Sequence, residues 1–188
     1  MNKMQQGRLI VFTGPSGVGK GTLLRSLLKH HPELELSTSV TTRAPRPGEI
    51  NGQHYYFVTL EEFDRMIEDG ELLEWAEFAG NYYGTPRRSV ERSIAQGKCA
   101  ILEIELEGAR QIRQTFPNAL RLFILPPSLC ELEHRIRGRG TESEESITRR
   151  LRRAKEEIEA ANEFDIQIVN DDLETALKKI EAAVFVHC

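Results

Sequence analysis

The feature that most constrains the fold of this chain is a glycine-rich loop between an apolar run and an amphipathic segment. The loop reads Gly14-Pro-Ser-Gly-Val-Gly-Lys20 and fits the pattern G-x-x-x-x-G-K. Residues 8–13 predict a buried strand, and residues 21–30 predict a helix with leucines on one face. In that setting the backbone N–H groups of the loop and the helix N-terminus bind phosphate oxygens. The sequence therefore predicts a nucleoside triphosphate site rather than a glycine-rich turn with a stray lysine.

The residue after the loop lysine departs from the usual pattern. A serine or threonine normally follows the lysine and ligates magnesium, whereas this chain has Gly21. Thr22 could touch a phosphate, but it starts about 100° further round the helix and is not an equivalent ligand. We expect Lys20 to bridge the β- and γ-phosphates of ATP, and Mg²⁺ to arrive with ATP, held mainly through water and by the nucleotide. The expected ATP-binding residues of the loop are Gly14, Pro15, Ser16, Gly17, Val18, Gly19, Lys20, Gly21 and Thr22.

The rest of the chain alternates expected strands with expected helices. Strands are predicted at residues 99–104, 120–125 and 164–169, and helices at residues 107–115, 128–137, 144–161 and 172–184. This alternation indicates a parallel sheet flanked by helices. Residues 37–96 break the rhythm and hold all four tyrosines and the only tryptophan. They predict a small mixed α/β lobe inserted after the first strand–helix unit.

Composition indicates a globular protein without attraction to polyanions. Hydrophobic residues make up 39% and charged residues 29%. The formal net charge of −4 gives no overall positive field for DNA, RNA or an anionic membrane. No apolar run approaches the roughly 20 residues that span a bilayer, and residues 1–8 lack the apolar stretch of a secretory signal. We expect a cytoplasmic protein with small-molecule substrates and no nucleic-acid or membrane partner; monomer and homo-oligomer both stay open.

Four motifs within the expected lobe are more specific than the phosphate loop. They read Ser39-Val-Thr-Thr-Arg43-Ala-Pro-Arg46-Pro-Gly-Glu49, Gly52-Gln-His-Tyr55-Tyr-Phe57, Leu73-Glu74-Trp-Ala-Glu-Phe78 and Gly80-Asn-Tyr-Tyr83-Gly-Thr85. With the phosphate loop and the ending Ile168-Val-Asn170-Asp-Asp172, they resemble the guanylate kinase family in order and spacing over nearly the whole chain. The resemblance implies a phosphate-loop NTPase-type α/β fold with an inserted GMP-binding lobe and a helical lid. It also implies transfer of the γ-phosphoryl group of ATP to GMP in purine nucleotide metabolism, with use of dGMP left open.

The resemblance places the acceptor nucleotide in the lobe. Arg43 and Arg46 would clamp the GMP phosphate, because guanidinium forks match phosphate oxygens, and tyrosine hydroxyls would help. Glu74 would read guanine, because a carboxylate accepts hydrogen bonds from both N1–H and the 2-amino group, whereas adenine offers an unprotonated N1. The implied GMP-binding residues are Ser39, Arg43, Arg46, Tyr55, Glu74, Tyr83, Thr85 and Glu103. Taken alone, the arginines would also suit a solvated loop, and the tyrosines would suit core packing.

Glu103 is the least regular of these positions. Glu103 and Glu105 stand where the family typically has aspartates, so each carboxylate reaches one methylene further. By resemblance, Glu103 would lie near substrate and magnesium. A strand with one solvated face is the alternative interpretation.

Arginines on either side of a glycine hinge resemble the mobile lid of the family. Arg139 and Arg150 are the best candidates for contacting the transferred phosphoryl group. Acidic neighbours could instead pair with these side chains along a surface helix, and Arg149, Arg152 and Arg153 are expected to be partly structural. The expected catalytic residues are Lys20, Arg46, Arg139 and Arg150, and the further ATP contacts are Arg135, Arg139, Asn170 and Asp171.

These assignments predict one domain over residues 1–188. Its parts are a core of residues 1–36 and 97–188 with the phosphate loop at 14–21, a GMP-binding lobe at 37–96 and a lid at 136–153. A related kinase with another phosphorylated acceptor, such as a ribosyl phosphate, is one alternative, against which Glu74 argues together with Ser39 and Thr85. A non-enzymatic guanylate-kinase-like module that binds phosphopeptides is another, against which the intact loop and the lid arginines argue.

Overall fold

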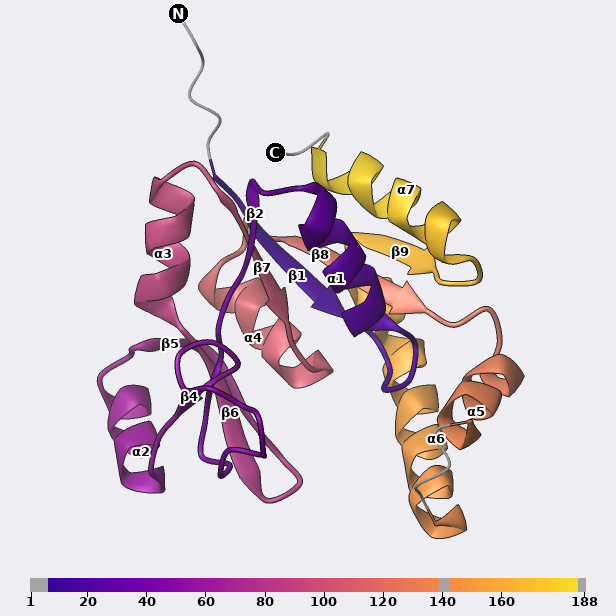
Figure 1. Ribbon diagram of the computed structural model, residues 1–188, viewed down its shortest axis with the longest axis horizontal. Coiled ribbons are helices and arrows are strands. Elements are labelled where there is room, and N and C mark those ends of the chain that lie inside the picture. Colours follow the sequence, from indigo (N-terminus) through magenta and orange to yellow (C-terminus); the bar gives the residue numbers. More distant parts are fainter. Residues whose placement is uncertain (1–6, 139–142, 186–188) are drawn as a thin grey trace, which may run out of the picture. The chain divides into compact units, whose positions relative to one another are not determined.

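A computed structural model describes residues 7–138 and 143–185, which fall into two compact units. Unit 1 contains the described residues up to Leu9 together with Glu33–Ala119, and unit 2 contains Ile10–Pro32 and the described residues from Leu120 onward. Figure 1 labels most of the helices and strands of both units. Unit 1 therefore takes in residues 97–119 as well as the expected lobe at 37–96.

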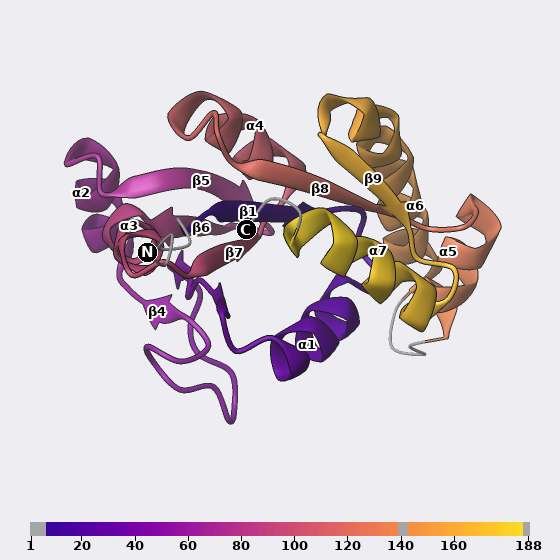
Figure 2. The same ribbon diagram turned by 90° about the horizontal axis from the view of Figure 1, so that it is seen from above.

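Unit 2 is built on parallel strands with helices on both faces. Strand β8 (Leu120–Leu125) pairs in parallel with β1 (Leu9–Thr13) and with β9 (Ile166–Val169). Helices α1 (Lys20–His30) and α7 (Leu173–Phe185) lie on one face of these strands, and α6 (Glu144–Glu159) lies on the other (Figure 2). Helix α5 (Leu129–Arg137) follows β8, and a 3₁₀ turn, η1 (Ala160–Glu163), follows α6.

The core of unit 2 follows directly from the apolar pattern of its strands and helices. All five residues of β1 are buried, as expected for a parallel strand that is covered on both faces. Helix α1 buries Leu23, Leu24 and Leu27 along one stripe. The ring of Phe123 packs edge-on against Phe164, with centroids 4.9 Å apart. Thr13, the last residue of β1 before the phosphate loop, pairs with Phe123 of β8, so the start of the loop adjoins this packed core.

Unit 1 combines a parallel strand pair with a mixed sheet. Strands β2 (Leu34–Leu36) and β7 (Cys99–Glu103) pair in parallel. The mixed sheet has the order β4 (Tyr56–Phe57), β3 (Val40–Thr41), β6 (Asn81–Pro86) and β5 (Leu72–Phe78). In it β3 is parallel to β4 and antiparallel to β6, which is antiparallel to β5. The helices of unit 1 are α2 (Leu60–Glu68), α3 (Arg87–Ala95) and α4 (Leu106–Thr115).

Helix α2 anchors the small core of the mixed sheet. A capping box starts the helix: Glu62 N donates to the Thr59 hydroxyl, and Thr59 N donates to the Glu62 carboxylate. Phe63 then packs with Val40 and Leu72 in a buried cluster. This cluster joins β3 to β5, the strand that carries the expected GMP-binding residue Glu74.

The expected α/β class is confirmed, and so are the predicted strands and helices, each within two residues at its ends. The long helix expected over 144–161 ends at Glu159, where η1 begins. Strand β2 was not predicted, because it has only three residues and buries only Leu34. In the described part of the chain, no helix has the length and apolar character needed to cross a membrane.

Candidate functional site

The glycines of the phosphate loop are required by the turn between β1 and α1. Gly14, Gly17 and Gly19 have φ angles of 152°, 90° and 101°, a region that side-chain-bearing residues rarely adopt. Gly14 also lies close to β8, since a Cβ there would stand 2.4 Å from the carbonyl oxygen of Ile124. The resulting turn leaves the N-terminus of α1 without a side-chain cap. Its backbone N–H groups are therefore available to an anion.

Lys20 places its charge on this loop. Its Nζ donates hydrogen bonds to the carbonyl oxygens of Gly14, at 2.5 Å, and Pro15, at 3.3 Å. The ammonium group thus lies over the same turn whose backbone would hold phosphate oxygens, which fits the role expected for Lys20.

Two residues expected to contact ATP hold the backbone of the phosphate loop. Asn170 Nδ2 donates to the carbonyl oxygen of Val18 at 2.8 Å, and Arg135 Nη1 donates to the carbonyl oxygen of Asn170 at 3.1 Å. Asn170 is only 7% exposed, and a Cβ on Gly19 would lie 2.6 Å from its Nδ2. Asn170 and Arg135 therefore fix the loop conformation. Asp171, the next residue in the chain, is exposed.

One arginine of the expected lid reaches the phosphate loop. Arg150 of α6 donates from Nη2 to the Ser16 hydroxyl at 2.7 Å. This contact places a guanidinium group next to the turn, where it could neutralise charge on a phosphoryl group. Arg139, the other catalytic candidate, lies outside the described residues.

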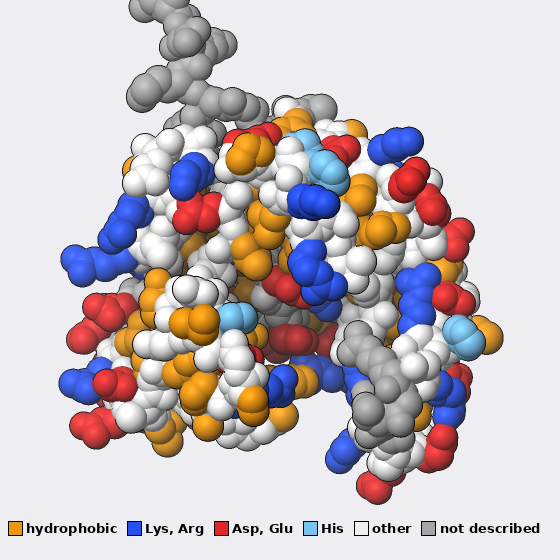
Figure 3. Space-filling model, in the orientation of Figure 1, with side chains coloured by type: hydrophobic (Ala, Val, Ile, Leu, Met, Phe, Trp, Pro, Cys, Tyr) orange, Lys and Arg blue, Asp and Glu red, His pale blue; other side chains and the backbone are white. Residues whose placement is uncertain are grey.

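Other arginines of this region form ion pairs with neighbouring acids. Arg137 pairs with Glu133 and Glu144, and Arg153 pairs with Glu157 one helical turn away. Figure 3 shows basic and acidic side chains next to one another over α5 and α6. The Arg153 pair fits the partly structural role expected for that residue, since such spacing stabilises helices.

The position after the loop lysine has room for a side chain. Gly21 does not have a positive φ, and a Cβ there would meet only the Nη1 atom of Arg25, at the ordinary distance of 3.6 Å. The hydroxyl of Thr22 accepts a hydrogen bond from Arg25 Nη2 at 3.2 Å. Across residues 7–138 and 143–185, no cluster of three or more His, Cys, Asp or Glu side chains is placed to hold a metal ion.

In unit 1, Arg43 is held between a carboxylate and aromatic rings. Its Nη2 lies 2.8 Å from Glu49 Oε1, and its guanidinium carbon lies 5.4 Å from the ring centroid of Tyr55 and 5.7 Å from that of Phe57. The rings of Tyr55 and Tyr83 meet edge-on at 6.0 Å. The hydrogen bond from Arg43 to Glu49 is the main reason that the pKa of Arg43 is raised.

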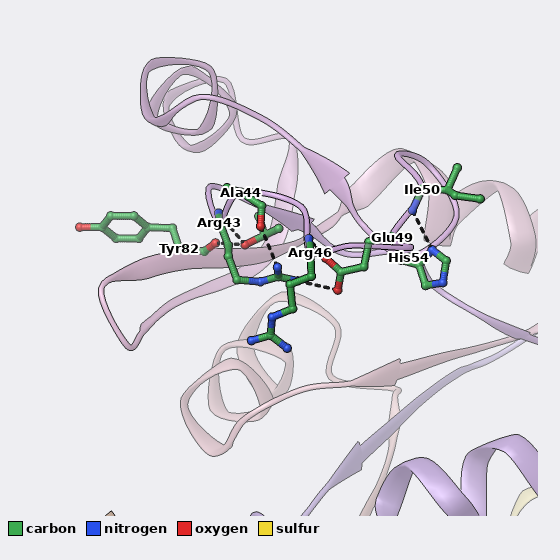
Figure 4. A network of polar contacts seen from close by, with 8 residues as sticks. Arg43, Ala44, Arg46, Glu49, Ile50, His54 and Tyr82 are labelled. Atoms are coloured by element: carbon green, nitrogen blue, oxygen red, sulfur yellow. Dashed lines mark hydrogen bonds and ion pairs between the residues drawn. The ribbon is translucent and has the colours of Figure 1, made fainter. Parts of the chain in front are cut away.

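Arg46 presents its guanidinium differently from Arg43. Its backbone N donates to Glu49 Oε2 at 2.7 Å, so the Glu49 carboxylate contacts the Arg43 side chain through one oxygen and the Arg46 backbone through the other (Figure 4). The Arg46 side chain is exposed, and its guanidinium has no hydrogen-bond partner among the described residues. Glu49 was not predicted as a site residue, although it closes the motif that contains both arginines. A carboxylate directly after the Pro-Gly turn was the available signal.

Glu74 and Thr85 form a buried pair across β5 and β6. They are register partners, and the Thr85 hydroxyl donates to Glu74 Oε1 at 2.6 Å. Glu74 is 5% exposed and Thr85 is 1% exposed. Burial raises the pKa of Glu74 to about 7, and the hydrogen bond from Thr85 offsets only part of that effect. A carboxylate buried to this extent, with its pKa raised, is a candidate for ligand recognition.

The remaining predicted residues of the lobe lie in the same unit. The carbonyl oxygen of Ser39 accepts a hydrogen bond from Tyr56 N at 2.8 Å, beside β3. Glu103 ends β7 and is exposed. Burial is the largest cause of the raised pKa of Tyr55, and the charge of Glu103 adds to it, so the phenol stays a proton donor. All eight expected GMP-binding residues therefore lie in unit 1, whereas the described ATP-binding candidates lie in unit 2.

Comparison with known proteins gives one consistent result. A family model described as Guanylate kinase matches residues 6–186. A guanylate kinase of Nostoc sp. is 68% identical over 179 residues, which cover 95% of this chain and 90% of that protein. A guanylate kinase of Thermosynechococcus vestitus is 66% identical over 181 residues, which cover 96% and 95%. The crystal structure of guanylate kinase from Anaplasma phagocytophilum matches with a TM-score of 0.77 at 33% identity, covering 97% of this chain and 86% of that one.

Proposed function

Because the chain belongs to the guanylate kinase family, we propose that it transfers the γ-phosphoryl group of ATP to GMP, giving ADP and GDP. The observation that carries the choice of substrate is the buried Glu74–Thr85 pair. An ionised carboxylate at this position can accept hydrogen bonds from N1–H and the 2-amino group of guanine together. Adenine would leave the carboxylate without these donors, which costs far more than a lost contact at the surface.

The proposed chemistry needs no covalent nucleophile from the protein. An oxygen of the GMP phosphate attacks the γ-phosphorus of ATP, the bond to the β,γ-bridging oxygen breaks, and ADP leaves. The protein positions both nucleotides and neutralises charge. In this proposal Arg43 and Arg46 hold the GMP phosphate, with Tyr55 and Tyr83 donating from their phenols, while Lys20 and Arg150 act on the transferred group.

The other proposed contacts complete the two nucleotide sites. Ser39 joins Thr85 in base recognition, and Glu103 acts beside the GMP. The loop residues 14–22, Arg135, Asn170 and Asp171 bind ATP, and Arg139 belongs to the lid. Magnesium enters as part of the substrate MgATP. Gly21 has no side-chain oxygen to ligate it, and the Thr22 hydroxyl accepts a hydrogen bond from Arg25. We place this activity in the cytoplasm, in purine nucleotide metabolism, with ATP and GMP as the partners.

The direct test of this function is an ADP-release assay with GMP, AMP, UMP and CMP as acceptors at equal concentrations. We expect kcat/KM for GMP to exceed that for AMP by at least about 10⁴-fold, since unpaired buried polar groups reject an analogue this strongly. Comparable rates with a ribosyl phosphate or with AMP would contradict the proposal. So would ATP-independent binding of a phosphopeptide without any transfer to GMP.

Gly21→Ser should be tolerated and should lower the magnesium concentration that gives half-maximal rate. The added side chain has space, and its hydroxyl would supply the direct ligand that this loop lacks. Initial rates against magnesium concentration measure the effect. Gly21→Ala is the matched control, because it adds the Cβ without the hydroxyl. A severe loss of activity in both variants with an intact fold would show that Gly21 is needed for close approach of the backbone to ATP.

GMP affinity should fall as the pH is lowered below 7. Burial raises the pKa of Glu74 from 4.5 to about 7, and only the ionised carboxylate accepts both guanine donors. Below pH 7, GMP binding must therefore remove a proton from Glu74. The apparent dissociation constant for GMP should rise by up to about tenfold for each unit by which the pH is lowered. Calorimetric titration with GMP from pH 5.5 to 8 measures this. The phosphate of GMP also titrates near pH 6, so the same titration on Glu74→Gln isolates the contribution of Glu74.

A further inference from the structure

Helix α4 holds strand β5 by hydrogen bonds on both sides of Glu74. Gln111 Oε1 accepts from Trp75 N at 3.0 Å, and Gln111 Nε2 donates to the carbonyl oxygen of Trp75 at 2.7 Å. The Thr115 hydroxyl donates to the carbonyl oxygen of Leu73 at 3.0 Å. Strand β5 is an edge strand of the mixed sheet, and its one neighbour in that sheet is β6. Gln111 therefore bonds backbone groups on the open edge of β5, away from β6. The residues on either side of Glu74 are therefore fixed by one helix.

The strand is irregular at the position where α4 holds it. The register between β5 and β6 shifts between Leu72 and Glu74, which leaves Leu73 out of the regular pairing. Such a bulge re-aims the side chains that follow it. Because Thr115 bonds the Leu73 carbonyl, the bulge is held by α4, and so is the direction of the Glu74 side chain.

Gly108 of α4 leaves the space that the Glu74 carboxylate occupies. It lies inside the helix and does not have a positive φ, so its backbone does not call for glycine. Glycine is also less favourable than alanine at such a position. A Cβ on Gly108 would lie 2.3 Å from Glu74 Oε2 and 3.1 Å from its Cδ. The Glu74 carboxylate is therefore the steric reason for a glycine at position 108.

We propose that α4 is the positioning element of the base-reading site, with Gly108 as a specificity-determining residue and Gln111 as a positioning residue. The two lie three residues apart, and Thr115 lies four further, so one helix face carries all three. Gly108 leaves room for the Glu74 carboxylate against the backbone of α4. Gln111 holds β5 at the distance from α4 at which the carboxylate fits there. The inference rests on the proposed role of Glu74 in reading guanine.

The test compares Gly108→Ala with Gln111→Ala, and Gln114→Ala serves as the control because Gln114 is exposed on the same helix. In Gly108→Ala the carboxylate must move, since it is the flexible end of a side chain. We expect KM for GMP to rise about tenfold or more, which is the effect of weakening hydrogen bonds to a charged group. KM for ATP should stay unchanged, and Tm should be unchanged or higher. The preference for GMP over inosine monophosphate, which lacks the 2-amino group, should fall. Gln111→Ala should also raise KM for GMP, whereas Gln114→Ala should leave it unchanged.

A double-mutant cycle separates this inference from the proposed function. In a Glu74→Ala background, Gly108→Ala should change KM for GMP by less than about twofold, because coupled residues lose their effect together. If Glu74→Ala itself leaves KM for GMP at the parent value, the proposed base-reading role is wrong. Suppose instead that Glu74→Ala raises KM for GMP. The positioning role alone is then wrong if Gly108→Ala and Gln111→Ala both leave KM for GMP unchanged, or if both raise KM for ATP as much as KM for GMP. Should Gly108→Ala fail to fold, Gln111→Ala alone decides.

Discussion

Replacing Glu74 with glutamine is expected to lower kcat/KM for GMP by more than about a hundredfold. An amide can accept only one of the two guanine hydrogen bonds and sets its own N–H group against the second donor. The side chain is 5% exposed, so water cannot make good the loss. Steady-state kinetics with GMP at fixed ATP measure the effect. Glu77→Gln is the matched control, because Glu77 lies on the same strand and is exposed. If kcat/KM for GMP is nearly normal in Glu74→Gln, the assignment of Glu74 to the GMP site is wrong.

The same substitution should change how stability depends on pH. The pKa of Glu74 is above its unfolded value of 4.5, so between pH 4.5 and about 7 the folded protein binds more protons than the unfolded chain. The free energy of unfolding therefore falls as the pH rises through this window, by up to about 3 kcal/mol from this group, and is constant above it. Denaturant titrations at pH 5 and pH 8 should show this decrease in the parent and not in Glu74→Gln. An equal decrease in both would assign the pH dependence to other groups.

Arg150→Ala should lower kcat by about 10³-fold while the dissociation constant for GMP changes little. Arg150 bonds Ser16 of the phosphate loop in unit 2, and the GMP-binding candidates lie in unit 1. A contact made with the transferred group stabilises the transition state and not the first encounter with GMP. Arg46→Ala should instead weaken GMP binding and also slow transfer, because its guanidinium is proposed to hold the acceptor phosphate.

Equilibrium titration of GMP together with single-turnover transfer separates the two arginines. Arg152→Ala is the control for Arg150→Ala, since Arg152 is exposed on the same helix. Weakened GMP binding with an unchanged kcat in Arg150→Ala would make Arg150 a contact of the acceptor site. An effect on neither quantity would mean that Arg150 belongs to a solvated helix face, like its neighbours.

Most of the candidate site could be predicted from local sequence, but the supports of that site could not. Residues 14–20 and the motif from Ser39 to Glu49 are contiguous, so their chemistry can be recognised without a fold. Asn170 and Val18, in contrast, are 152 positions apart, and the hydrogen bond between them follows only from the placement of β9 beside β8. The contact of Gly108 with Glu74 likewise depends on α4 lying along β5, which no periodic pattern predicts.

The sequence by itself determined the α/β class, because runs of buried strand residues and one-sided helices are local patterns that follow from backbone geometry. It also determined the phosphate loop, whose glycines are needed for the turn they make. Only the tertiary structure decided that Glu74 is a buried acid with a raised pKa, since desolvation depends on every neighbour that excludes water. It also decided that Arg43 is paired with Glu49 whereas the guanidinium of Arg46 has no partner among the described residues. Two arginines in one motif look alike in sequence, and they differ because packing gives one a carboxylate within 2.8 Å and leaves the other exposed.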